Sequence, residues 1–328
     1  MRRLAARMVI AGMAIAVGAA AAGCSSAAGL AYTKGPAPAS SKSTSMAVTA
    51  VVPGTARVKT ESGPAISVVG APQGVKARTG ILVDATTGQV LWSEGENTPR
   101  PIASITKVMT ALVVLQAGGL NRQLAVPNAV IAYDARYSAN AAGLVPGQRF
   151  TADELLRMML IVSAADAAYT LASAYGPGLP AFVAKMNAEA AKLGLTRTHF
   201  TTPDGLPYPT ATSTYSTPAD LVILGEAAMG NPEFRSIVGT PFYNLPKTAA
   251  HSAVSVRNSD ALIGTYPGAV GIKDGFTVAA GHTLLFEAVR GGRTLIGVVL
   301  GSPPSGPASG AQDATRVLNW GFTQKQAG

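Results

Sequence analysis

Short apolar runs separated by turn residues begin and end the main part of the chain, whereas longer helical patterns fill its middle. Residues 80–84 and 90–93 flank the segment Thr86–Gln89, a pattern typical of a β-hairpin. Further strands are predicted over residues 254–256, 269–273, 283–289 and 294–300. Helices are predicted over residues 104–116, 151–161, 164–175, 180–193, 217–229 and 311–322. We therefore expect an α+β fold, in which the hairpin and the last strands form one antiparallel sheet with helices packed on it, plus a helical subdomain.

The first 23 residues have the pattern of an export signal. Three arginines precede an apolar run of fifteen residues, 8–22, which is shorter than the roughly 20 residues of a transmembrane helix. The run ends in Ala21-Ala22-Gly23-Cys24, which is similar to the lipobox of bacterial lipoproteins. Cys24 is the only cysteine of the chain, which favours its lipidation over simple cleavage that leaves it incidental. We expect a lipid anchor on Cys24 and a location outside the cytoplasm, at the cell membrane or cell wall.

Residues 24–77 consist mostly of Ala, Ser, Thr, Pro, Gly and Val, with Tyr32 as their one aromatic residue. Such a composition cannot build a hydrophobic core, so we expect a flexible tether. The catalytic domain is then expected to span residues 78–328.

Charge and composition exclude several classes of protein. The formal net charge of +9 comes mainly from the first 77 residues, so it fits an export leader and an anionic membrane surface better than a nucleic-acid site. Hydrophobic residues make up 48% of the chain and charged residues 13%, which argues against wholesale disorder and against a coiled coil. One cysteine permits no intramolecular disulfide, and the three histidines show no metal-ligand spacing, so we expect no metal and no cofactor.

The candidate chemistry starts with Ser104-Ile-Thr-Lys107, at the beginning of a predicted helix. Positions i and i+3 share a helix face, so the lysine can reach the serine hydroxyl. A serine is a weak nucleophile until a base takes its proton, and a lysine can do so when burial or a second cation keeps it neutral. Taken alone, this four-residue pattern arises often by chance.

Two downstream segments make the pattern specific. Ser163-Ala-Ala165 follows an apolar helix, and Lys273-Asp274-Gly275 lies on a predicted strand that continues to Thr277. In order and rough spacing, the three segments resemble the motifs of the low-molecular-mass penicillin-binding proteins. These are serine D-Ala-D-Ala carboxypeptidases of peptidase family S11, with a β-lactamase/transpeptidase-like fold. The resemblance covers about residues 78–326.

The resemblance implies a reaction and a role for each residue. Ser104 attacks the D-Ala-D-Ala peptide bond of a peptidoglycan stem peptide and forms an acyl-enzyme, with Lys107 as its general base. Ser163 relays a proton to the leaving amine. Lys273, with Gly275 and Thr277, binds the substrate. β-Lactams acylate the same serine, no cofactor takes part, and the partners are stem peptides, β-lactams and, through the N-terminal lipid, the membrane.

Two residues depart from the family pattern. Ala165 replaces an asparagine of the second motif, and Asp274 replaces a threonine of the third. An aspartate repels a substrate carboxylate and can pair with Lys273, which leaves three alternatives open: an active carboxypeptidase, an enzyme of changed specificity, and a catalytically impaired peptidoglycan-binding or regulatory homologue. A β-lactamase is less favoured, because Glu189, the nearest candidate for a deacylating glutamate, lies in a helical pattern with lysines that indicates a solvated face.

Overall fold

The computed structural model describes residues 66–326, apart from residues 138 and 307. The predicted signal segment, Cys24 and most of the predicted tether therefore lie outside the described residues. Within the described part, no helix is both long and apolar enough to span a membrane.

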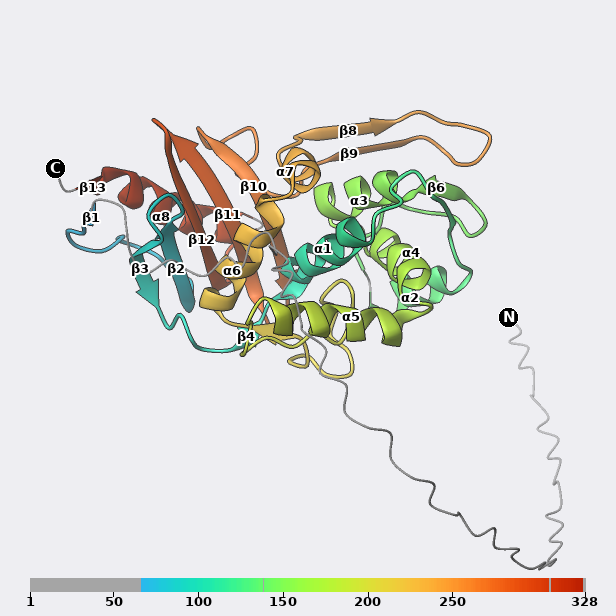
Figure 1. Ribbon diagram of the computed structural model, residues 1–328, viewed down its shortest axis with the longest axis horizontal. Coiled ribbons are helices and arrows are strands. Elements are labelled where there is room, and N and C mark those ends of the chain that lie inside the picture. Colours follow the sequence, from blue (N-terminus) through green and yellow to red (C-terminus); the bar gives the residue numbers. More distant parts are fainter. Residues whose placement is uncertain (1–65, 138, 307, 327–328) are drawn as a thin grey trace, which may run out of the picture. The chain divides into compact units, whose positions relative to one another are not determined.

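The centre of the fold is a five-stranded antiparallel sheet (Figure 1). Its strand order is β10-β11-β12-β2-β3, so the N-terminal hairpin completes a sheet begun by the last three long strands, as predicted. The strands are β2 (Thr79–Asp84), β3 (Gln89–Glu94), β10 (Ala269–Thr277), β11 (Gly281–Arg290) and β12 (Arg293–Ser302). The edge strand β10 carries Lys273 opposite Leu285 of β11, and no strand of the described residues pairs with its other side.

Alternate residues of the sheet supply two separate hydrophobic clusters. Leu82 and Phe286 join the cluster formed with α8 (Ser309–Thr323). Ile81 and Leu285, their neighbours along the strands, join the large cluster on the opposite face, to which α6 (Pro218–Met229) belongs. Because side chains alternate across a strand, the two helices cover opposite faces of the same sheet. The predicted antiparallel sheet with helices packed on it is confirmed, and the structure adds that helices cover both of its faces.

The remaining helices form a group at the β10 end of the sheet (Figure 1). They are η1 (Ala103–Thr106, a 3₁₀ turn), α1 (Lys107–Ala117), α2 (Ala129–Tyr137), α3 (Ala152–Ile161), α4 (Ala165–Tyr175), α5 (Leu179–Lys192) and α7 (Pro232–Val238). The start of α3 is fixed by a capping box between Thr151 and Glu154. Nearly all of α1 is buried, so this helix forms the core of the group and positions its first residue, Lys107, firmly.

Several short elements escaped the sequence pattern. They are the paired strands β1 (Ile66–Ser67) and β13 (Lys325–Gln326), β4 (Arg100–Pro101) and β7 (Tyr215–Ser216), β5 (Gln123–Ala125) and β6 (Arg149–Thr151), and the strand β8 (Phe242–Leu245), which pairs with the predicted strand β9 (Val254–Arg257). Helices α2 and α7 were also not anticipated. Elements of two to four residues are too short to show a period, so pairing with a distant partner decides their structure.

The folded part begins earlier than the predicted boundary at residue 78. Residues 66 and 67 pair with the end of the chain in β1 and β13. The Val69 amide donates to Gln324 (2.8 Å) and the Lys76 amide donates to Asp313 (3.0 Å). Backbone hydrogen bonds of this kind need no apolar side chains, so composition alone could not reveal that residues 66–77 lie against α8 and β13.

Candidate active site

Ser104 lies in the turn η1, which leads directly into α1. Ala103, just before it, has a left-handed backbone conformation (φ +48°), a strained state for alanine that is typical of functional turns. The Ala103 carbonyl accepts a hydrogen bond from the Thr106 hydroxyl (2.8 Å). On its other side it packs against Gly205, where a Cβ atom would come within 1.9 Å of the carbonyl oxygen. The turn is therefore held from both sides while the Ser104 side chain stays partly accessible.

Lys107 is almost completely buried, with 2% of its surface exposed. Its Nζ atom donates to the Ser104 Oγ atom (3.0 Å) and to the Asp204 carbonyl oxygen (3.1 Å). Burial, opposed by Asp204 and assisted by nearby Lys273, lowers the pKa of this lysine to about 8. A lysine with such a pKa is neutral in a large fraction of molecules at mildly alkaline pH and can accept the proton of Ser104.

Strand β10 runs directly against the Ser104 turn. A Cβ atom on Gly275 would lie 2.8 Å from the Ser104 backbone nitrogen, so only glycine fits at this position. The Thr283 hydroxyl lies 3.2 Å from both the Ile102 and the Gly275 carbonyl oxygens, to which it can donate. The first and third predicted motifs thus meet at one point, with Gly275 as the contact.

The Lys273 side chain is buried and makes an ion pair with Asp274. Its Nζ atom also donates to the Ser259 hydroxyl (3.1 Å), which in turn donates to the same Asp274 oxygen (2.6 Å). Burial acts to raise the pKa of Asp274, but Lys273 and Ser259 outweigh it and lower that pKa, so the carboxylate is charged. Burial raises the pKa of the adjacent Asp260 to about 7. The third motif therefore holds a cation whose charge is already compensated.

The second motif lies in the connection between α3 and α4. Ser163 is 7% exposed and has a left-handed backbone conformation (φ +66°). The Ala165 amide donates to the Asn140 carbonyl oxygen (2.8 Å), and the Asn140 side chain donates to the Val162 carbonyl oxygen. Asp166 accepts from two amides of the same neighbouring loop. This fixes the backbone of the motif, although residue 165 itself lacks an amide side chain.

The structure brings together some predicted site residues and leaves others apart. Ser104 and Lys107 are in direct contact, and Lys273 is close enough to influence Lys107. Among the described residues, the Ser163 hydroxyl forms no hydrogen bond with Ser104 or Lys107. The Thr277 hydroxyl accepts from the Ala280 amide (3.1 Å) and thereby stabilises the turn after β10. The roles assigned to Ser163 and Thr277 stay predictions.

The sequence pattern predicted that Glu189 lies on a solvated face. This prediction is wrong, because only 7% of the Glu189 surface is exposed. It accepts hydrogen bonds from Gln116 (2.8 Å) and Lys192 (2.9 Å). Gln116 lies near the end of α1, nine residues or roughly 13 Å from Lys107 at the usual helical rise. Glu189 therefore connects two helix ends far from Ser104, and this disfavours a role in deacylation.

Three site residues were not identified from the sequence. Asp204 is buried; its carbonyl accepts from Lys107, and its carboxylate accepts from the Tyr133 hydroxyl (2.9 Å). Ser259 completes the hydrogen bonds around Lys273. The Pro-Asp-Gly turn at residues 203–205 was a local signal, but nothing local indicates that Tyr133 or Ser259 reaches the site.

Comparison with known proteins agrees with this geometry. The family model for D-alanyl-D-alanine carboxypeptidase, peptidase S11, matches residues 66–304. The D-alanyl-D-alanine carboxypeptidase DacB2 of Mycobacterium tuberculosis is 41% identical over 247 residues, covering 75% of this chain and 82% of its own length. The D-alanyl-D-alanine carboxypeptidase of Streptomyces sp. strain K15 is 36% identical over 260 residues, covering 76% and 88%.

Solved structures give the same answer. The crystal structure of the Streptomyces K15 DD-transpeptidase superposes with a TM-score of 0.72 at 34% identity, covering 78% of this chain and all of that one. A D-alanyl-D-alanine carboxypeptidase from Mycobacterium tuberculosis superposes with a TM-score of 0.71 at 39% identity, covering 81% and 97%. The fold and the site define a serine-type peptidase with the penicillin-binding-protein architecture. The chain belongs to the D-alanyl-D-alanine carboxypeptidase family, peptidase S11.

Proposed function

We propose that this protein removes the terminal D-alanine from peptidoglycan stem peptides through an acyl-enzyme on Ser104. One observation carries the proposal: the buried Lys107 amine, with a pKa of about 8, lies 3.0 Å from the Ser104 hydroxyl. The names of the two curated relatives support the substrate, since both are D-alanyl-D-alanine carboxypeptidases.

The first half of the reaction forms the acyl-enzyme. Neutral Lys107 takes the Ser104 proton while Oγ attacks the carbonyl carbon of the D-Ala-D-Ala peptide bond. When the carbon–nitrogen bond breaks, the leaving amine receives a proton that Lys107 supplies through Ser163. Free D-alanine departs and an ester remains on Ser104.

The second half releases the shortened peptide. Lys107 is neutral again after giving up its proton, and it takes a proton from water as the water attacks the ester carbon. The ester bond breaks, and the Ser104 oxygen regains a proton from Lys107. The first half needs only the substrate and the chain's own groups, and the second half consumes one water molecule. Because penicillin carries a strained amide in place of the peptide bond, it acylates the same oxygen.

Lys273 is the proposed contact for the substrate's terminal carboxylate. Its ion pair with Asp274 opposes this role, because an incoming carboxylate meets a second negative charge at the same place. We expect productive binding that is weaker than a threonine at position 274 would give. Export and a lipid on Cys24 belong to the same proposal, since peptidoglycan lies outside the cytoplasm, and they rest on the pattern of residues 1–24.

Intact-protein mass spectrometry after incubation with benzylpenicillin tests the first half, and D-alanine release from a pentapeptide stem tests the whole reaction. We expect a covalent adduct and D-alanine release with the wild type, and neither with Ser104→Ala. Folded wild-type protein that forms no adduct and releases no D-alanine between pH 6 and 10 would overturn the proposal.

The compensated charge of Lys273 favours a second candidate, a peptidoglycan-binding protein with little turnover. In that case, sacculi should retain wild-type and Ser104→Ala protein equally, while D-alanine release stays at background. Robust turnover, or loss of retention in both proteins, excludes it.

A further inference from the structure

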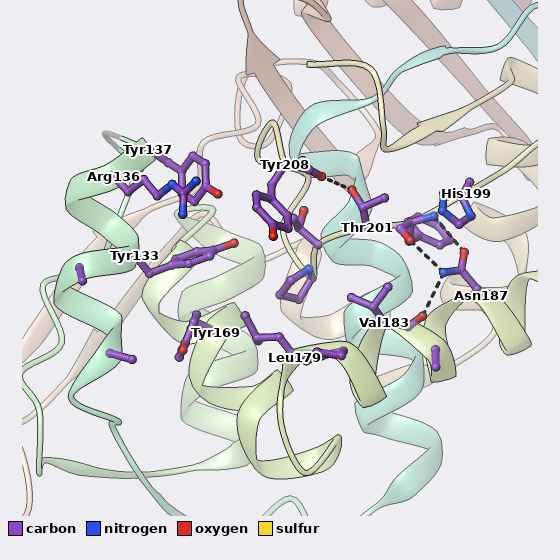
Figure 2. Close-up of a pocket in the computed structure, with 17 residues that line it drawn as sticks. Tyr133, Arg136, Tyr137, Tyr169, Leu179, Val183, Asn187, His199, Thr201 and Tyr208 are labelled. Atoms are coloured by element: carbon purple, nitrogen blue, oxygen red, sulfur yellow. Dashed lines mark hydrogen bonds between the residues drawn. The ribbon is translucent and has the colours of Figure 1, made fainter. Parts of the chain in front are cut away.

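A large cavity lies beside the site, with a volume of about 770 Å³. Helices α2, α4 and α5 and the segment 199–208 form its walls. Figure 2 shows Tyr133, Arg136 and Tyr137 on one side, Tyr208 across from them, and Leu179 and Val183 below. Neither Ser104 nor Lys107 lines this cavity, so the reaction proposed above does not use it.

Four tyrosine rings line the cavity: Tyr133, Tyr137, Tyr169 and Tyr208. The ring of Tyr133 lies 5.2 Å from that of Tyr137 and 4.8 Å from that of Tyr169, measured between centres. The hydroxyls of Tyr137, Tyr169 and Tyr208 form no hydrogen bond with any other residue that the structure describes. The wall therefore offers flat apolar faces edged by available hydroxyl groups, the amphipathic character that tyrosine brings to binding sites.

Arg136 is the charged residue of the wall. Its guanidinium carbon lies 5.4 Å from the centre of the Tyr137 ring and 5.6 Å from that of Tyr208, so two rings hold it in place. Within the described residues, no acidic side chain forms an ion pair with it. A guanidinium that is fixed by stacking and lacks a carboxylate partner is suited to bind a carboxylate from a ligand.

We propose that this cavity binds a sugar ring that bears a carboxylate group. A pyranose ring has apolar C–H faces that stack on tyrosine and hydroxyls at its edge that bond to tyrosine hydroxyls, while Arg136 pairs with the acid. A purely hydrocarbon ligand is disfavoured, because it would remove water from three hydroxyls and one guanidinium without replacing their hydrogen bonds.

Ligand-observed saturation-transfer NMR and titration calorimetry test the site with matched sugars. N-acetylmuramic acid is compared with N-acetylglucosamine, which lacks the lactyl carboxylate, and D-glucuronate with D-glucose. The full chain carries Ser104→Ala, so that the outcome does not depend on catalysis. We expect at least one acid to bind about tenfold more tightly than its neutral partner, as a charge-assisted pair allows.

Arg136→Gln should remove this preference without unfolding the protein, since the side chain is exposed. The matched control is Arg122→Gln. Arg122 is also exposed, and its guanidinium carbon lies 5.7 Å from the centre of the Tyr175 ring, but it does not line the cavity, so the preference should persist.

Three results overturn the proposal: neither acid binds better than its neutral partner, the preference survives Arg136→Gln, or 2-naphthoate binds more tightly than both sugar acids. The last result indicates an aromatic anion instead. None of them bears on the Ser104 reaction, which is measured separately by acylation and D-alanine release.

Discussion

Lys107 and Lys273 are both buried, yet their surroundings differ in kind. Lys107, at the start of α1, has two neutral partners, the Ser104 hydroxyl and the Asp204 carbonyl. Lys273, on the sheet edge β10, has the Asp274 carboxylate and the Ser259 hydroxyl. Burial lowers the pKa of Lys107, which has no carboxylate in direct contact, whereas Lys273 forms an ion pair. The same residue type thus supplies a base on the helical side and a fixed cation on the sheet side.

The contrast between the two lysines also shows which part of the site the substitution at residue 274 affects. The helical side keeps its Ser-x-x-Lys geometry and a suitable pKa, so it is equipped for acylation. The sheet side has gained a negative charge where the substrate carboxylate is proposed to bind. We therefore expect the substitutions to affect substrate binding more than the chemistry of Ser104.

Removing the amine on the helical side should have the largest effect. Lys107→Met keeps an apolar chain of similar size but supplies no base, so acylation by benzylpenicillin should slow by about a thousandfold, within the usual range for a general base. Stopped-flow or mass-spectrometric acylation rates measure this change. Lys192→Met, at an exposed lysine far from Ser104, is the control and should acylate at the wild-type rate. A Lys107→Met protein that acylates normally would refute the assignment of the base.

The pH dependence should be the next largest effect. Lys107 has a pKa of about 8, depressed by burial, and only its neutral form can take a proton. The acylation rate should therefore rise as the pH increases through about 8, level off above that value, and be about a hundredfold lower at pH 6 than at the plateau. Rates measured from pH 6 to 10 test this. A flat profile, or one that falls across pH 8, would contradict a lysine base.

Gly275 joins the two sides, and Gly275→Ala should disturb both. The new Cβ atom would lie 2.8 Å from the Ser104 nitrogen, so β10 and the turn must move apart. Overpacking of this kind should lower the free energy of unfolding by about 1–3 kcal/mol, measured by urea denaturation. Gly230→Ala is the control, because its Cβ atom meets nothing closer than 3.4 Å and it should be nearly neutral. Equal stability of both variants would show that the contact is loose.

Removing the carboxylate that pairs with Lys273 should have the smallest of these effects. In Asp274→Thr the Lys273 charge is no longer compensated, so kcat/KM for a pentapeptide should rise about fivefold, corresponding to about 1 kcal/mol. Because Asp274 raises the pKa of Lys107, the midpoint of the pH profile should also move to lower pH. Ser259→Ala keeps the ion pair and should change both quantities less. An unchanged kcat/KM and midpoint would mean that Asp274 does not affect the site.

Much of the fold could be predicted, because long elements carry their own periodicity. The strands over 283–289 and 294–300 are mostly apolar, and both lie in the interior of the sheet. The helix near Ser104 was also expected, although its first turn is a 3₁₀ turn. By contrast, residues 66–77 are held by hydrogen bonds to residues 313–326, and separations of this size leave no local pattern.

Site residues that interact within one helix or strand could be predicted from the sequence. Site residues that come together from several elements could not be predicted as well. Ser104 and Lys107 are three positions apart on one turn, and the pairing of Lys273 with Asp274 was anticipated as a possibility of neighbouring residues. The third partner, Ser259, arrives from a loop outside the sheet, and only the folded chain brings it there.

Asp204 contacts both the active site and the tyrosine-lined cavity, and this affects how the activity of mutants should be interpreted. Its carbonyl oxygen accepts from Lys107, while its carboxylate accepts from Tyr133, a wall residue of the tyrosine-lined cavity. Removing the Tyr133 hydroxyl frees one end of a residue whose other end orients the base. A Tyr133→Phe enzyme that hydrolyses more slowly would therefore not prove that the cavity holds the scissile peptide, and ligand binding there must be measured directly.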